Sequence, residues 1–307
     1  MEESRWGVIY SSRVGTSRSH KRWLAMQQYM EKRGVRYDFL QSEGTGSMER
    51  LSHMLCENAY HTLVVVGNDY ALGEALNGIL RTENLPDDFA LGLIPNGIGN
   101  DFARFWGVGI DDYRKTIDRI IERRTRRIDV GVCVYTDADN VPIRNYFINC
   151  VNIGLGARLI DVTDRATRLI GSKRVSMLTA TLANIFERKS YNIHLKADTE
   201  EMQTEVMSIC IGNCTGYGQT PNSVPYNGML DLSIITRPQW WQLFEGFYLL
   251  GKGKFLNYKN VHPYRVHKVE IYDEGRARVS LDGKMLDTRN LTPMRIELMP
   301  EALNYII

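Results

Sequence analysis

Apolar runs and amphipathic segments alternate through the first third of the chain. The apolar runs predict buried strands at residues 6–12, 35–41, 61–67 and 89–95. The segments between them have apolar residues at helical spacing and predict helices at residues 20–34, 48–59 and 71–83. Alternation at this pace is typical of a doubly wound, mostly parallel sheet with helices on both faces. Ligands of such sheets bind beyond the carboxyl ends of the strands, where Gly67 and Gly97 fall.

The pattern changes after a predicted helix at residues 111–127. Short apolar runs separated by polar turns follow, and they predict strands at 127–136, 144–154, 190–197, 205–213, 229–236, 268–273, 277–283 and 294–300. Two segments of helical character interrupt them, at residues 172–189 and 239–255. Dense short strands with turn signals predict an antiparallel β-sandwich or barrel. We therefore expect an α/β domain over residues 1–128 and a β-rich domain over residues 129–291.

Composition limits the class of partner and the compartment. The net charge of +2 leaves no domain-wide basic excess, so no nucleic acid is expected as a partner. The five cysteines lack the spacing of a zinc site, and we interpret them as small apolar residues in a reducing compartment. The sequence lacks a signal-peptide pattern and an apolar run of roughly 18 residues. A cytoplasmic protein is expected, with any membrane contact peripheral, and homodimer formation is left open.

Two glycine-bearing turns follow predicted strands of the first domain. One is Gly67-Asn68-Asp69, and the other lies in IPNGIGNDFAR at residues 94–104. A strand-to-helix turn offers backbone N–H groups and the positive end of a helix dipole, and glycine lets the backbone approach a phosphate closely. Asp69 would hold a magnesium ion through water. Each turn alone is weak evidence, because Gly-Asn and Asn-Gly are also common in ordinary turns. Two such turns at strand ends of one sheet favour a nucleotide site.

These motifs resemble the diacylglycerol kinase catalytic domain family, which includes bacterial soluble lipid kinases and sphingosine kinases. GNDYALGEALNGI at residues 67–79 is similar to the family's Gly-Gly-Asp-Gly-Thr turn with the Glu and Asn-Gly that follow it. PNGIGNDFAR at 95–104 resembles its Pro-x-Gly-Thr-Gly-Asn-Asp-Phe-Ala-Arg segment. YFINCVNIGLGA at 146–157 resembles the opening of the family's second domain, and VSLDGKMLD at 279–287 its Asp-Gly-Glu motif. The matching segments span nearly the whole chain in the family's order.

The resemblance implies a fold, a reaction and a set of site residues. It implies an N-terminal domain like those of phosphofructokinase and NAD kinase, to which residues 292–307 return, and a C-terminal β-sandwich. It also implies transfer of a phosphoryl group from ATP, with Mg²⁺, to a lipid hydroxyl, with diacylglycerol as the first candidate. Asp282 would be the general base, with Asp101 and Arg104 in the active-site cleft. The implied nucleotide contacts are Ser11, Gly15, Gly67, Asn68, Asp69, Glu74, Gly97, Gly99 and Asn100.

The chain also departs from the family's pattern around the nucleotide. Asn68 and Tyr70 replace glycines of the first turn, Ile98 replaces the threonine of the second, and Lys284 replaces the glutamate of Asp-Gly-Glu. At positive φ, Tyr70 would cost about 1–2 kcal/mol, and its ring would crowd the γ-phosphate. The alternative function is therefore an inactive lipid-kinase-like protein with a lipid-binding or regulatory role. For Asp282, the alternative is an ordinary Asp-Gly hairpin turn.

Two further segments have two interpretations each. Arginines concentrate at the end of the predicted helix 111–127, either on a solvated helix face or on a surface attracted to anionic membranes; they are Arg119, Arg123, Arg124, Arg126 and Arg127. Residues 239–255 combine aromatic residues with Lys252 and Lys254, which suits either a helix packed on a sheet or a position at the water–lipid interface. We expect most of the apolar residues in this second segment to pack in the core, with the position of Trp240 left open.

Overall fold

A computed structural model describes residues 5–11, 17–97, 99–136, 139, 141–159, 189–286 and 293–307. The chain divides into two compact units, one of Met1–Val130 with Pro300–Ile307 and one of Gly131–Met299. Strands β5 (Thr125–Thr136) and β15 (Met294–Ile306) each contribute residues to both units. Most of the helix predicted at 172–189 lies outside the described residues. Within the described ranges, no helix is long and apolar enough to cross a membrane.

Four parallel strands form the central sheet of the first unit. They are β1 (Trp6–Ser11), β2 (Tyr37–Ser42), β3 (Thr62–Gly67) and β4 (Ala90–Pro95), in the order β4-β3-β1-β2. Every residue of β1, β3 and β4 is buried, which explains their continuous apolar sequences. The end of β15 adds a parallel contact, because Tyr305 pairs with Leu91.

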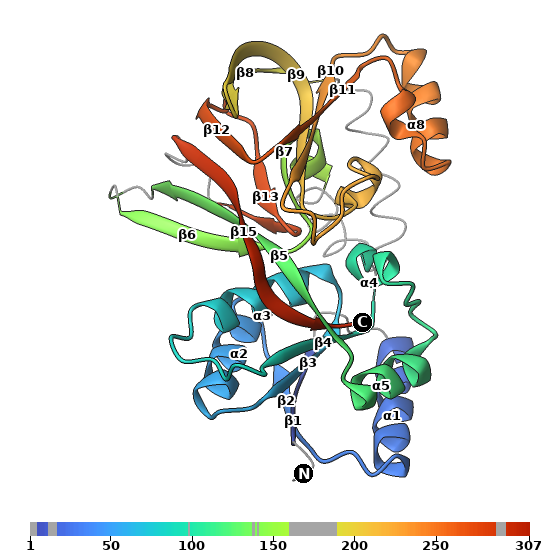
Figure 1. The fold of residues 1–307 in the computed structure, drawn as a ribbon. Helices are drawn as coiled ribbons and strands as arrows, with labels where there is room; N and C mark the ends of the chain where they lie inside the picture. Colours follow the sequence, from blue (N-terminus) through green and yellow to red (C-terminus); the bar gives the residue numbers. More distant parts are fainter. Residues whose placement is uncertain are drawn as a thin grey trace. The chain divides into compact units, whose positions relative to one another are not determined.

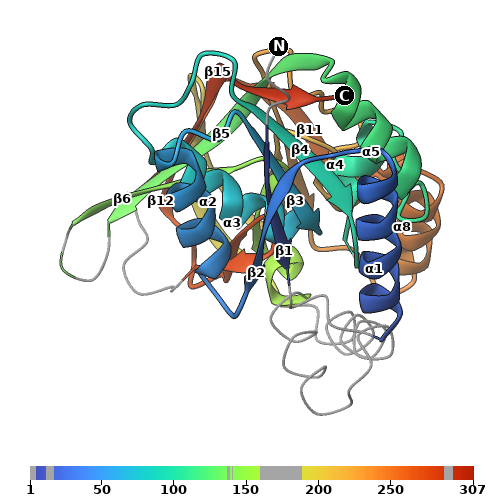
Figure 2. The ribbon, with the colours of Figure 1, turned by 90° about the horizontal axis from the view of Figure 1, so that it is seen from below.

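Helices cover both faces of this sheet, which confirms the predicted doubly wound domain. Figures 1 and 2 show α1 (Ser17–Lys32) and α5 (Tyr113–Glu122) on one side of β1–β4 and α2 (Ser47–Glu57) and α3 (Asp69–Leu80) on the other. Apolar side chains of α1 and α5 pack with those of the strands in one cluster, whose members include Trp23, Met26, Ile117, Ile120, Val8 and Val64. The short helix α4 (Asp101–Phe105) follows β4.

The second unit is an antiparallel β-sandwich, as predicted. Its strands, besides β5 and β15, are β6 (Pro142–Phe147), β7 (Cys150–Gly154), β8 (Tyr191–Ala197), β9 (Glu200–Gly212), β10 (Leu230–Thr236), β11 (Val261–Val266), β12 (Lys268–Asp273), β13 (Val279–Leu281) and β14 (Lys284–Met285). The long β9 pairs with β8 along its first half and with β7 and β10 along its second half. Alternating residues of these strands fill one core. Two short 3₁₀ turns, Gly216–Gly218 and Phe255–Asn257, and helix α8 (Gln242–Gly251) complete the unit.

Several details differ from the sequence-based predictions, including the bounds of β9 and β15, which are longer than predicted. The helix predicted at 111–127 ends at Glu122, because Arg123 adopts φ 52° and residues from Thr125 on form β5. The strand predicted at 144–154 is two strands, β6 and β7, separated by a turn. The edge strand β11 was not predicted. In α8 the expectation of core packing is wrong for Phe244 and Tyr248, which are exposed; the structure also places Trp240 on the surface.

Candidate functional site

The two glycine-bearing turns lie side by side at the carboxyl ends of β3 and β4. Gly67 and Pro95 are paired at the ends of these strands. The N–H of Asn96 donates to the carbonyl oxygen of Gly67 at 2.8 Å, and the N–H of Asp69 donates to the carbonyl oxygen of Gly99 at 2.9 Å. The structure therefore brings together the two segments that the sequence marks as nucleotide turns.

Glycine is required at three positions of these turns. A Cβ added at Gly67 would lie 2.7 Å from the Cβ of Ala71 and 3.2 Å from the Cβ of Ser11, so the close approach of strand and helix needs glycine. Gly97 and Gly99 have φ of 111° and 85°, which other residues rarely adopt. The space over Gly99 is open, because an added Cβ would meet nothing within 4 Å. Backbone at this position is therefore accessible to a ligand.

Asp69 caps the helix that starts in the second turn. Its Oδ2 accepts the N–H of Asp101 at 2.8 Å, and its Oδ1 accepts the N–H of Phe102 at 3.3 Å. The residue is 1% exposed. These are the first N–H groups of α4, which have no partner within their own helix. The Asp69 carboxylate caps them, because the side chain of the N-cap residue Asn100 does not. Asp69 thereby fixes the second turn to the first.

The other residues of the first turn also bond within the unit. The side chain of Asn68 caps α3 by accepting the N–H of Ala71 at 3.2 Å. Tyr70 lies in the first turn of α3 and has no positive φ, so the expected strain does not arise. Its hydroxyl donates to Oε1 of Glu74 at 2.8 Å, and the same oxygen accepts the N–H of Gly46 at 2.9 Å. Oε2 of Glu74 is buried and has no hydrogen-bond partner in the described part of the chain.

Asn100, Asp101 and Arg104 lie at the start of α4. The side chain of Asn100 donates from Nδ2 to the carbonyl oxygen of Gly97 at 3.0 Å, while its buried Oδ1 has no partner among the described residues. Asp101 is mostly buried and forms an ion pair with Arg104. The Arg104 side chain is 68% exposed, so its guanidinium is accessible to an anion from solvent.

Ser11 and Gly15 complete the predicted nucleotide set in the first unit. Ser11 is the last residue of β1 and is buried beside Gly67. Gly15 and Ile98 lie outside the described residues. Sequence reasoning missed Asn96, a fully buried residue of the second turn whose Oδ1 accepts from Arg22 of α1 at 3.1 Å. An Asn between a strand and a glycine was the available signal, but it is equally typical of a plain turn.

Asp282 lies in the second unit, in a two-residue hairpin loop between β13 and β14. Asp282 and Gly283 both have positive φ, 46° and 87°, as a type I′ turn requires. The carboxylate is 3% exposed and accepts three consecutive backbone N–H groups that precede or begin β7. Oδ2 accepts from Ile148 at 2.6 Å, and Oδ1 accepts from Asn149 and Cys150 at 2.9 Å each. These backbone partners were not predicted from the sequence.

Burial and hydrogen bonds act on the Asp282 carboxyl in opposite directions. Burial raises its pKa, and the three backbone N–H groups lower it; the balance raises the pKa to about 6. A carboxyl group with this pKa changes charge close to neutral pH, as suits a general base. Oδ2 accepts one N–H and has a second lone pair available for a proton.

A direct magnesium ligand set is not found around these carboxylates. Within the described ranges, no three acidic, histidine or cysteine side chains converge as a metal site would require. Both oxygens of Asp69 accept backbone N–H groups, which does not fit a direct ligand role. The expectation that Asp69 holds a metal ion through water stays a prediction.

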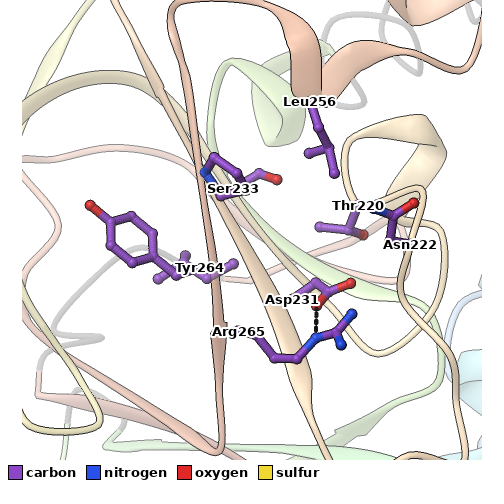
Figure 3. Close-up of a pocket in the computed structure, with 9 residues that line it drawn as sticks. Thr220, Asn222, Asp231, Ser233, Leu256, Tyr264 and Arg265 are labelled. Atoms are coloured by element: carbon purple, nitrogen blue, oxygen red, sulfur yellow. Dashed lines mark hydrogen bonds and ion pairs between the residues drawn. The ribbon is translucent and has the colours of Figure 1, made fainter.

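The second unit contains a cavity of about 240 Å³ beside β10 and β11 (Figure 3). Asp231 and Arg265, on paired positions of these strands, form an ion pair at 3.0 Å along its wall. The hydroxyl groups of Thr220 and Ser233 donate to backbone carbonyl oxygens at 2.8 Å each. These polar groups are thus bonded to the protein itself, and Leu256 adds an apolar wall.

The arginine-rich segment binds to its own unit. Arg119 donates to the carbonyl oxygen of Trp106, and Arg127 donates to that of Glu301. Arg123 donates to the carbonyl oxygens of His61 and Asp88. These three side chains are bonded within their own unit, which disfavours the membrane-binding interpretation of the segment.

Comparisons with known proteins agree with this architecture. The diacylglycerol kinase catalytic domain family matches residues 5–133, and the YegS C-terminal NAD kinase beta sandwich-like domain family matches residues 149–307. Diacylglycerol kinase of Bacillus subtilis (strain 168) is 22% identical over 282 residues, which are 90% of this chain and 88% of that protein.

Solved structures share the fold. The crystal structure of a diacylglycerol kinase from Bacillus anthracis is similar over 100% of this chain and 97% of its own, with a TM-score of 0.67 and 16% identity. Yeast NADH kinase in complex with NADH is similar over 99% of this chain and 83% of its own, with a TM-score of 0.55 and 9% identity. The fold of the chain is therefore that of diacylglycerol kinases and NAD kinases.

Proposed function

Because the chain belongs to the diacylglycerol kinase catalytic domain family, a family of nucleotide-using lipid kinases, we propose that it is an ATP-dependent kinase acting on the hydroxyl group of diacylglycerol. The observation that carries the proposal is the hydrogen-bonded pair of glycine turns at the ends of β3 and β4. Such turns beyond the strands of a doubly wound sheet are where phosphate groups bind. A lipid acceptor would place the reaction at a membrane surface, with the protein associated peripherally.

In this proposal the second turn binds the phosphate groups of the nucleotide. Gly97 and Gly99 have positive φ, which only glycine adopts readily and which anion-binding loops use, and the space over Gly99 is open. The exposed guanidinium of Arg104 would neutralise charge on the transferred phosphoryl group. The other nucleotide contacts stay predictions, and they are Ser11, Gly15, Gly67, Asn68, Asp69, Glu74 and Asn100.

Asp282 would act as the general base. Its carboxylate would accept the proton of the lipid hydroxyl at Oδ2 while the hydroxyl oxygen attacks the γ-phosphorus. The bond from the γ-phosphorus to the bridging oxygen breaks, and ADP leaves with the electron pair. Phosphatidic acid and protonated Asp282 result. Mg²⁺ would arrive with the phosphates of the nucleotide, since the described residues provide no ligand set of their own.

One observation favours the alternative of an inactive, lipid-binding or regulatory relative. Donors that would face a phosphate at the first turn are bonded to the protein, because the N–H groups of Asp69 and Ala71 donate to Gly99 and Asn68. The N–H groups of Asp101 and Phe102 donate to the Asp69 carboxylate, which adds negative charge there. A nucleotide would have to bind mainly to the remaining backbone of the second turn.

Thermal unfolding with and without Mg-ATP separates the two functions. A ligand at about 100 times its dissociation constant stabilises a protein by roughly 2.7 kcal/mol, which shifts the unfolding temperature by several degrees. We expect this shift for the kinase and none at millimolar nucleotide for the inactive relative. A shift with a nucleotide other than ATP would overturn the ATP assignment alone.

Transfer of labelled phosphate to diacylglycerol tests the reaction and its base. We expect Asp282→Asn to lose transfer and keep the stabilisation by Mg-ATP, while Asp87→Asn, at an exposed position, changes neither. The amide NH₂ of Asn would oppose the N–H groups of residues 148–150, so the unfolding temperature of this variant must be measured beside its activity. Unchanged transfer by Asp282→Asn would refute the base.

A further inference from the structure

Helix α8 and the residues before it carry four large aromatic side chains on the surface. Trp240, Trp241, Phe244 and Tyr248 are 60%, 54%, 72% and 65% exposed. Phe244 and Tyr248 are one helical turn apart, and Trp241 precedes Phe244 by three residues, so these three share one side of the helix. The rings of Trp240 and Trp241 contact each other with centroids 5.8 Å apart. We call these four residues the aromatic face.

The opposite side of α8 already anchors the helix to its unit. Leu249 and Leu250 pack against a cluster that includes Phe255 and Tyr258. Gly246 lies against the ring of Tyr258, since an added Cβ would be 3.1 Å from it. A helix anchored on one side normally presents polar residues on the other. The aromatic face therefore contributes little to folding, and an exposed apolar patch of this kind indicates an interaction site.

Basic residues flank the aromatic face. Arg237, Lys252, Lys254 and Lys259 are exposed, and Glu245 is the single acidic residue between positions 237 and 259. The segment therefore has an excess of three positive charges. The ammonium group of Lys252 lies 5.8 Å from the centre of the Tyr248 ring. Tryptophan and tyrosine beside lysine are the combination that binds at the interface of a bilayer with anionic headgroups.

We propose that the aromatic face, with its basic flank, is the surface through which this protein docks on an anionic lipid bilayer. This inference rests on the proposed function, because a kinase of a membrane lipid has to reach its substrate there. A second copy of the chain fits less well, since a two-fold contact would bring two basic flanks together. Docking in this way would place α8 (Figure 1, orange) at the level of the lipid headgroups.

Sedimentation of the full-length protein with vesicles tests the surface. We expect binding to phosphatidylcholine vesicles that contain phosphatidylglycerol, with a blue shift of tryptophan emission. Trp240→Ser/Phe244→Ser should weaken binding by at least about tenfold, since two large apolar side chains no longer leave water. Lys252→Gln/Lys254→Gln should cost about fivefold per lysine, and only on vesicles with the anionic lipid. Val141→Ser/Tyr272→Ser, at exposed apolar positions elsewhere in the unit, should leave binding unchanged.

Kinase activity separates failure of the docking surface from failure of the proposed function. Trp240→Ser/Phe244→Ser should lose phosphorylation of diacylglycerol in vesicles and keep phosphorylation of a short-chain diacylglycerol in solution. Vesicle binding that depends on α8 in a protein with no kinase activity would overturn the proposed function and leave docking standing. Wild-type binding and activity on vesicles in the double variant would overturn docking alone. Docking would also be refuted if the wild type were a dimer that the double variant dissociates, as sedimentation velocity would show.

Discussion

At the residue scale, two carboxylates with predicted catalytic or metal roles are also hydrogen-bonded into the fold. Asp69 accepts two backbone N–H groups and Asp282 accepts three. A substitution at either position therefore changes stability as well as chemistry. Sequence motifs identified these residues but not their partners, because Ile148 is 134 positions away from Asp282 and contributes only its backbone. A hydrogen bond to a backbone group cannot be predicted from the pattern of side chains, because every residue except proline has the same N–H group.

Asp69→Ala is expected to destabilise the first unit. The change leaves the first N–H groups of α4 buried without an acceptor, which costs about 1–3 kcal/mol. Urea unfolding of the full-length protein measures this cost. Asp87→Ala serves as the control, since Asp87 is exposed, and should change the free energy of unfolding by less than about 0.5 kcal/mol. Equal stability of the two variants would contradict the capping role.

Asp282 predicts a pH dependence with opposite signs for catalysis and stability. The ionised form accepts the proton, so kcat/KM for phosphoryl transfer should rise as pH increases through about 6 and then level. The folded-state pKa is raised from 3.8, so the contribution of Asp282 to stability is full below that value and lost as pH rises through about 6. Activity and denaturant unfolding measured across this range would show both trends. A flat kcat/KM profile would contradict the assignment.

At the scale of elements, strands were predicted correctly where burial on both faces is the only cause of the apolar pattern. β1, β3 and β4 are covered on both faces, so their sequences are continuous apolar runs. β11 was not predicted because it is an edge strand in which only the first and last residues are buried and Pro263 lies in the middle. The end of α5 was misplaced because Arg123, and not a glycine, adopts the left-handed conformation that ends the helix.

The crossing of α2 and α3 depends on Gly78. A Cβ at this position would overlap the carbonyl oxygen of Glu49 and the hydroxyl of Ser52. Gly78→Ala should therefore cost about 1–3 kcal/mol, although alanine is ordinarily favoured over glycine inside a helix. Gly251→Ala in α8 has open space around it and should be neutral or stabilising. Thermal unfolding of both variants makes the comparison, and equal unfolding temperatures would contradict the close crossing.

At the scale of the whole molecule, the first unit is built from both ends of the chain. Leu303, Tyr305 and Ile306 are buried, and the ring of Tyr305 contacts Phe102 at 5.0 Å between centroids. The side chain of Asn304 donates to the carbonyl oxygen of Phe89 at 3.1 Å. The resemblance to a known family implied this return, whereas hydrophobic periodicity indicated only a last strand without a partner.

Deletion of residues 300–307 should unfold the first unit. Three buried side chains of this size contribute about 1.5–3 kcal/mol each, and their sum is comparable to the net stability of a domain. Limited proteolysis is expected to cut residues 17–122 of the truncated protein rapidly, while the core of the second unit stays protected. Protection of residues 17–122 equal to that in the full-length protein would contradict the expectation.

The position of the last strand also sets the order of events during synthesis. Residues 5–130 emerge from the ribosome early, but Tyr305 emerges only after the entire second unit has been synthesised. Until then, β4 of the nascent first unit lacks its neighbour β15. A chain cut short by premature termination would never acquire a finished first unit, so proteases would recognise it even if its β-sandwich had folded.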